Sequence, residues 1–158
     1  MRRPNPKMLL HIGIGDAYCA ALEYVDWHDN HAELLALQRY LPHPTHGLPA
    51  GSYTDDTQMS IAAANALLGD EKDYRDEKFW AAQFLWAFNQ DRRKGYARGF
   101  QRFLERTASA DEFLKNIRRG SDKNGAAMRS VPIGVIPQVG MLLKVAELQA
   151  GITHNTTW

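Results

Sequence analysis

The alanine-rich run in the middle of the chain decides the fold: it reads DDTQMSIAAANALL over residues 55–68. Alanine and leucine have the highest helix propensities, so the run predicts a helix, and Gly69 is expected to supply a C-terminal stop. Because small and apolar side chains surround the helix axis, we expect this helix to be tightly packed and central.

The chain on the N-terminal side of this run predicts a helix and then a loop. Small and apolar residues recur at helical spacing over residues 12–25, without the alternation of a β-strand. Residues 42–52 contain three prolines and two glycines, a density that prevents regular structure. This loop leads to Thr54, which directly precedes the alanine-rich run.

Apolar stripes predict three further helices on the C-terminal side. Their core-facing residues are Trp80, Phe84 and Phe88 in the first, Phe100, Phe103 and Leu104 in the second, and Phe113, Leu114 and Ile117 in the third. Ser109 with Glu112 forms a capping-box pattern for the third helix, and Gly120 is expected to close it. A last helix is expected from Pro137, with proline at its first position, to Gly151, with glycine as its C-terminal cap.

Composition excludes several classes of protein. The chain has 158 residues, of which 44% are hydrophobic and 23% charged, and this balance excludes a disordered, collagen-like or coiled-coil protein. We therefore predict a single all-α domain over residues 1–158. The formal net charge of +1 provides no global field toward nucleic acid or a membrane. Cys19 is the only cysteine, which excludes an intrachain disulfide, and no run has the features of an export signal, so we expect a cytoplasmic protein.

The residues that begin the alanine-rich helix carry the clearest chemistry. Asp55 and Asp56 are adjacent carboxylates, and the hydroxyls of Thr54 and Thr57 flank them. Four such oxygen atoms suit a hard cation. The same residues also fit a structural role, in which Thr54 caps the helix and the carboxylates complement its dipole.

Two further runs carry polar or small residues. Asp16 and Glu23 are seven residues apart, so a helix through both would present two carboxylates on one face. Residues 120–125 read GSDKNG and precede a predicted helix, where free N–H groups and the helix dipole can hold phosphate. Taken separately, the first pair fits solvated or capping groups, and the second run fits a helix end followed by a new helix.

Weaker patterns have simpler explanations. A basic stripe at steps of four residues fits a solvated helix face better than a phosphate contact; it contains Lys94, Arg98, Arg102 and Arg106. Two histidine pairs have a spacing that zinc can use, but no cysteine joins them and Pro44 places the second pair in a loop; they are His28 with His31, and His43 with His46. Tyr53 and Trp158 fit either an adenine contact or cover for the core.

In chain order, these runs resemble the ADP-ribosylglycohydrolase family, which includes the dinitrogenase reductase-activating glycohydrolase and the ADP-ribosyl-acceptor hydrolases. The matching blocks are GDA at 15–17 with Glu23, YTDDTQM at 53–59, NGAAMR at 124–129 leading to PIG at 132–134, and THN at 153–155. Four blocks in the family's order make a specific signal. The resemblance implies a compact all-α fold that corresponds to the N-terminal part of the family and is truncated relative to it.

What the resemblance implies is metal-dependent hydrolysis of the glycosidic bond between ADP-ribose and an acceptor. Thr54, Asp55 and Asp56 would be metal ligands, with two Mg²⁺ or Mn²⁺ ions in a complete site. Asp55 and Asp56, together with Glu23 beside the reacting ribose, would be the catalytic residues. The residues that would bind the substrate are Gly120, Ser121, Asn124, Gly125, Met128 and His154, with His154 reaching toward the phosphates. The acceptor could be arginine, serine, another side chain, a base or a free nucleotide.

One difference from the family concerns a second acidic cluster. Family members usually carry an Asp-x-Asp-Thr/Ser run near the C-terminus that completes the metal pair, whereas this sequence reaches Trp158 without one. Three interpretations follow: a fragment of a longer protein, a short form completed by a second chain such as a homodimer partner, or a non-catalytic module that binds ADP-ribose or a nucleotide. The expected partners are ADP-ribose or an ADP-ribosylated acceptor, and not a membrane or nucleic acid.

Overall fold

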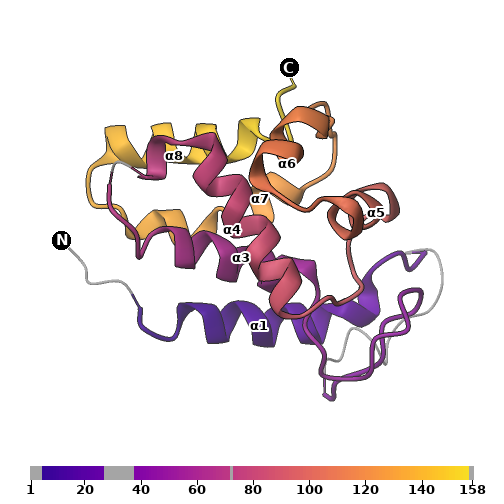
Figure 1. Ribbon diagram of the computed structural model, residues 1–158. Coiled ribbons are helices and arrows are strands. Elements are labelled where there is room, and N and C mark those ends of the chain that lie inside the picture. Colours follow the sequence, from indigo (N-terminus) through magenta and orange to yellow (C-terminus); the bar gives the residue numbers. More distant parts are fainter. Residues whose placement is uncertain (1–4, 27–37, 72, 157–158) are drawn as a thin grey trace.

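The chain folds into helices joined by loops and short turns (Figure 1). The computed structural model describes residues 5–26, 38–71 and 73–156, and their only β-pairing is an isolated bridge between Gly120 and His154. The α-helices are α1 (Met8–Cys19), α3 (Asp55–Ala66), α4 (Glu77–Gln90), α5 (Arg98–Arg106), α6 (Ala110–Asn116), α7 (Gly125–Met128) and α8 (Val139–Gly151). The 3-10 helices are η1 (Ala20–Leu22), η2 (Asp73–Arg75) and η3 (Val131–Val135). The all-α prediction is confirmed.

The alanine-rich helix α3 lies at the centre of the fold. It packs against α1 on one side and α4 on the other, and Figure 1 shows it between them. Ala62, Ala63 and Ala66 of α3 are fully buried, and their short side chains leave room for the large rings of α4. Those rings belong to Trp80, Phe84 and Phe88, which are also fully buried. The predicted central helix and the predicted core stripe of α4 are both confirmed.

Side-chain caps fix where three of the helices begin. The hydroxyl of Thr54 accepts the N–H of Asp56 (3.3 Å) at α3, and the carboxylate of Asp76 accepts the N–H of Lys78 (2.9 Å) at α4. At α6, Ser109 accepts the N–H of Glu112 (3.2 Å), as the capping-box pattern predicts. The Glu112 carboxylate accepts the N–H of Ala108, which precedes the cap residue Ser109, whereas in a complete capping box it would accept the N–H of Ser109 itself.

The first helix differs from its prediction. It begins at Met8, ends at Cys19 and tightens into the 3-10 turn η1, after which Glu23 is extended (φ −68°, ψ 134°). Because a 3-10 turn has about 3.0 residues per turn, it changes the direction of successive side chains. The prediction that Asp16 and Glu23 share one helix face is therefore wrong.

Two predicted helix ends are also wrong, and the last helix starts later than predicted. Helix α3 ends at Ala66, three residues before Gly69, and α6 ends at Asn116, because Ile117 is extended (ψ 136°). Gly120 does not close α6 and instead pairs with His154. Helix α8 starts two residues after Pro137, and Gly151 is its last residue, followed by Ile152 in right-handed helical geometry.

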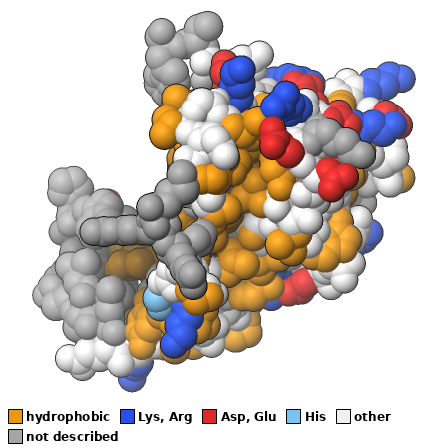
Figure 2. Space-filling view, turned by 90° about the vertical axis from the view of Figure 1, so that its left-hand side faces the viewer, with side chains coloured by type: hydrophobic (Ala, Val, Ile, Leu, Met, Phe, Trp, Pro, Cys, Tyr) orange, Lys and Arg blue, Asp and Glu red, His pale blue; other side chains and the backbone are white. Residues whose placement is uncertain are grey.

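Apolar side chains also reach the surface. Exposed examples are Leu10 and Ile14 in α1, Leu68 after α3, and Val139 and Leu143 in α8. Figure 2 shows apolar side chains spread over much of one face. Within residues 5–26, 38–71 and 73–156, no helix has the length and hydropathy needed to cross a membrane.

The core supports a prediction about stability. Phe84 is fully buried beside the rings of Trp80 and Phe113, whereas Trp86 on the same helix is 41% exposed. Phe84→Ala should lower the free energy of unfolding by about 3–5 kcal/mol, since it removes contacts and leaves a cavity. Trp86→Ala should cost at most about 1 kcal/mol. Urea denaturation measures both, and equal losses would contradict the placement of Phe84 in the core.

Candidate functional site

A single cleft of about 990 Å³ brings the predicted site residues together. One wall comes from the end of α1 and the start of α3, and it carries Glu23, Asp55 and Asp56. The other wall comes from the start of α5, from residues 116–125 and from the end of the described chain. The volume is at the upper end of the range typical of small-molecule sites.

The cleft contains most of the residues that the resemblance singles out. These are Glu23, Asp55, Asp56, Gly120, Ser121, Asn124, Gly125, Met128 and His154. Thr54 does not line the cleft. Segments that are distant in sequence thus meet at one place, and the roles assigned to their residues stay predictions.

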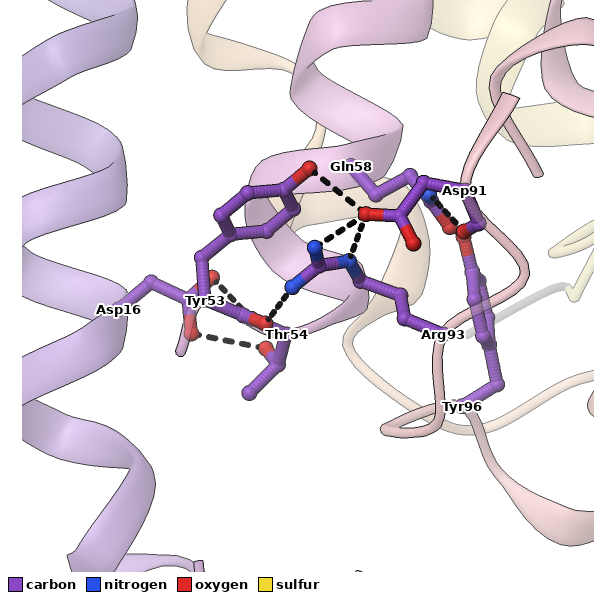
Figure 3. A network of polar contacts seen from close by, with 7 residues as sticks. All are labelled: Asp16, Tyr53, Thr54, Gln58, Asp91, Arg93 and Tyr96. Carbon is purple, nitrogen blue, oxygen red and sulfur yellow. Dashed lines mark hydrogen bonds and ion pairs between the residues drawn. The ribbon is translucent and has the colours of Figure 1, made fainter. Parts of the chain in front are cut away.

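Asp16 of α1 holds the start of α3 in place through the hydrogen bonds to Thr54 that Figure 3 draws. This carboxylate is buried in α1, and it accepts four hydrogen bonds from two residues of the next segment. Thr54 donates its N–H (2.8 Å) and its hydroxyl (2.8 Å), and Thr57 donates its N–H (3.1 Å) and its hydroxyl (2.5 Å). Asp16 therefore positions the two neighbouring carboxylates without facing the cleft itself.

Thr54 has a structural role in this arrangement. Its side chain is fully buried, and its hydroxyl donates to Asp16 and accepts the N–H of Asp56. The capping role that the sequence left open is therefore present. A role for Thr54 as a metal ligand stays a prediction.

A polar network supports the loop that follows α4 (Figure 3). The Arg93 guanidinium lies 3.4 Å from the centroid of the Tyr53 ring, donates to the Tyr53 carbonyl (2.6 Å) and pairs with the Asp91 carboxylate. Gln58 of α3 donates to the Asp91 carbonyl (2.7 Å) and accepts from the Tyr96 hydroxyl (2.6 Å). The loop is thereby fixed to the first turns of α3, and Tyr53 is used for this contact rather than for lining the cleft.

Gly95 is the residue of this loop that touches the acidic wall. Its φ of +129° is open to glycine, and a Cβ at this position would lie 3.1 Å from both the N and the Oδ1 of Asp55. Only glycine allows this close approach. The sequence analysis missed Gly95, because a single glycine after Arg-Arg-Lys carries no distinctive pattern.

The paired carboxylates have perturbed acidities. Burial, and then repulsion by Asp56, raises the pKa of Asp55 to about 7. Burial, and then repulsion by Asp16 and Glu23, raises the pKa of Asp56 to about 6. The wall therefore gathers more negative charge than its surroundings compensate, and such a site favours a bound cation.

Glu23 is held by a histidine that the sequence analysis had considered only for zinc. The side chain of His43 is fully buried, and its Nδ1 accepts from the N–H groups of Thr45 (3.1 Å) and His46 (3.2 Å). The proton therefore lies on Nε2, which donates to Glu23 (3.1 Å). Among the described residues, no three His, Cys, Asp or Glu gather closely enough to hold a metal ion. His28, His31 and Trp158 lie outside those residues.

The opposite wall is built by the bridge between Gly120 and His154. Ser121 donates its N–H to Thr153 (3.3 Å), and Asn155 donates to Arg119 (2.5 Å). The helix that follows, α7, has only four residues, so its dipole is much weaker than the sequence suggested. Gly125 faces His154: a Cβ on Gly125 would lie 3.2 Å from the histidine Cε1.

Although the net charge is only +1, the basic and acidic residues are unevenly distributed along the chain. Residues 92–123 contain ten of the nineteen Lys and Arg residues but only four of the eighteen Asp and Glu residues. Arg118 and Lys123 from this segment line the cleft opposite Asp55 and Asp56. The predicted basic stripe is exposed, as a solvated face requires, although its first member, Lys94, precedes α5. One cleft thus joins an acidic wall to a basic one.

An all-α protein with these two walls is a candidate for binding an anionic ligand next to a cation. The sequence model of the ADP-ribosylglycohydrolase family matches residues 7–157, so the chain belongs to that family. An uncharacterized protein of Archaeoglobus fulgidus is 28% identical over 162 residues, which cover 94% of this chain and 48% of that protein. The chain spans about half the length of this relative.

The raised pKa values predict how stability depends on pH. Between the ordinary aspartate pKa and about 7, folded Asp55 binds a proton that the unfolded chain releases, so its contribution to stability falls as pH rises. With metal removed by a chelator, Asp55→Asn should gain on the order of 1–3 kcal/mol of stability at pH 8 and flatten the dependence between pH 5 and 8. Thermal unfolding measures this. Glu147→Gln, at an exposed position of α8, is the control and should change neither.

Proposed function

We propose that the cleft binds the ADP-ribose part of a modified acceptor and hydrolyses the glycosidic bond between them. The observation that carries the proposal is the meeting of Glu23, Asp55 and Asp56 with the Gly120–His154 wall in one cavity. Membership of the ADP-ribosylglycohydrolase family supports a glycohydrolase-type function. The presence of both acidic and basic side chains in the cleft supports it further, because a sugar diphosphate needs positive groups to bind its phosphates, away from the bond that is cleaved.

We further propose that Asp55 and Asp56 hold Mg²⁺ or Mn²⁺. The donor set fits in kind, because both ligands are carboxylate oxygens, and the raised pKa values mark an uncompensated negative site. The hydroxyl of Thr54 donates to Asp16, so in this proposal Thr54 orients the two carboxylates, and its own role as a metal ligand stays a prediction. A bound divalent ion of this kind lowers the pKa of water and polarises a leaving bond.

The remaining side chains bind and orient the substrate in this proposal. His43 fixes the Glu23 carboxylate, so that Glu23 faces the ribose from a defined direction. Arg118 and Lys123 supply positive charge for the diphosphate, beside the small residues of the Gly120–Gly125 segment. His154 lies at the end of the same wall and reaches toward the phosphates.

A second candidate is a module that binds ADP-ribose or a nucleotide without cleaving it. The observation that favours it is that the part of the chain described by the structure offers Asp55 and Asp56 but no third metal-binding side chain beside them. Two carboxylates supply only part of a coordination shell. Association with a second chain, which would complete the site, stays a prediction; the exposed apolar side chains seen in Figure 2 are compatible with it.

Release of ADP-ribose from a modified protein tests the function. Turnover should require Mg²⁺ or Mn²⁺, and Glu23→Gln should lower its rate by about 10²–10⁴-fold, since it removes a carboxylate beside the reacting sugar. Asp55→Ala should abolish turnover and weaken binding of Mg²⁺ in calorimetric titration. Zinc that binds tightly and survives Asp55→Ala would contradict the metal assignment. Binding of ADP-ribose without any turnover would favour the second candidate.

Binding of ADP-ribose to the Gly120–Gly125 segment gives a separate prediction. Gly125→Val should abolish the thermal shift produced by ADP-ribose, because a side chain there meets the His154 ring at 3.2 Å. Gly140→Val is the matched control, since a Cβ on Gly140 has no atom within 4 Å. If both variants retain the shift, the ligand binds elsewhere.

A further inference from the structure

Arg129 is a buried cation next to the cleft, and it has no carboxylate partner among the described residues. Its Nε donates to the Gln149 side chain (2.6 Å), and one terminal nitrogen donates to the Gln149 carbonyl (2.8 Å) and to the Thr153 hydroxyl (2.8 Å). The ring of Phe84 lies 4.5 Å from the guanidinium carbon. Arg129 is therefore held on three sides and oriented toward Thr153.

Thr153 connects this cation to His154. A guanidinium can only donate hydrogen bonds, so the Thr153 oxygen must accept from Arg129. The Thr153 oxygen lies 2.6 Å from the His154 Nδ1, which is the only acceptor that the described residues offer to the hydroxyl proton. Donation from Thr153 to Nδ1 is the favoured arrangement, because the reverse direction leaves the hydroxyl proton without an acceptor among the described residues, and it places the imidazole proton on Nε2.

The Nε2 of His154 is buried and makes no well-formed hydrogen bond with the residues described, although the Lys123 carbonyl lies close enough to the ring to affect its pKa. It lies beside Gly125, where an added Cβ would be 3.5 Å away, and the His154 ring lines the cleft. A buried donor without a partner is costly, and a site that keeps one is organised for a group that arrives later.

We propose that Arg129 and Thr153 are positioning residues that hold His154 as the neutral Nε2–H tautomer, so that the ring presents a fixed hydrogen-bond donor to an oxygen atom of the ligand in the cleft. The identity of that ligand as ADP-ribose rests on the proposed function. The tautomer does not, because it follows from the order of donors and acceptors in the free protein.

The charges around His154 agree with a neutral ring. Burial and the Arg129 guanidinium lower the pKa of His154, and the Lys123 carbonyl and Asp122 oppose them more weakly. Burial also lowers the pKa of Arg129, to about 9, which leaves the guanidinium charged at pH 7. The hydrogen-bond chain from Arg129 through Thr153 to His154, here called the relay, therefore begins at a charged guanidinium donor and ends at the N–H of a neutral imidazole.

Nitrogen-15 NMR of histidine-labelled protein at pH 7 tests the tautomer directly, with His154→Gln assigning the signal among the six histidines. The wild type should show His154 protonated on Nε2 alone. Thr153→Val removes the relay and should give a mixture of tautomers, with ADP-ribose binding weakened about tenfold, the loss expected for one misplaced hydrogen bond. Thr153→Ser keeps the hydroxyl and should restore both readouts.

Thr107→Val is the matched control, because Thr107 is another buried threonine that does not line the cleft, and its hydroxyl donates to the Phe103 carbonyl rather than to a histidine. It should leave the His154 signals unchanged. An Nδ1–H or protonated His154 in the wild type, or an unaltered tautomer in Thr153→Val, would overturn the proposal. A fixed Nε2–H form in a wild type that does not bind ADP-ribose would support the relay and refute the assigned ligand.

Discussion

The carboxylate of Asp16 is the constraint on which the rest of the site depends. It accepts two backbone and two hydroxyl hydrogen bonds from Thr54 and Thr57, and these join α1 to the first turn of α3. Hydrogen bonds to a charged acceptor are stronger than neutral ones, and a buried carboxylate left without them would be very costly. The position of the whole acidic wall relative to the first helix therefore rests on one side chain that never faces the cleft.

The acidic wall itself is arranged at the expense of stability. Two adjacent carboxylates are partly buried near Glu23, and their raised pKa values show that the folded protein disfavours their charged forms. Core residues such as Ala62 and Trp80 have no such conflict, since they are apolar and fully buried. Carboxylates with raised pKa values in a cleft are a pattern typical of functional sites.

The helices could be predicted from local residue patterns, whereas the residues of the cleft were indicated by the family resemblance. The stripe of Trp80, Phe84 and Phe88 and the cap at Ser109 follow directly from residue spacing. The pairing of Gly120 with His154 and the link from His43 to Glu23 do not, because each joins segments that are distant in the chain. Predicted helix ends at Gly69 and Gly120 were wrong for a related reason: glycine permits a helix to end but does not require it.

The bridge between Gly120 and His154 has a consequence for how the cleft forms. It closes a long loop, and the entropy of loop closure must be met before its few hydrogen bonds contribute. The residues between Gly120 and His154 include Ile133, Val145 and Ile152 of the apolar core, whereas, in the described part of the chain, α1 contributes no residue to that core and is joined to α3 by the hydrogen bonds of Asp16. The two walls therefore form in different ways: the wall at Gly120 and His154 depends on the burial of apolar core residues, and the acidic wall depends on the hydrogen bonds of one buried carboxylate.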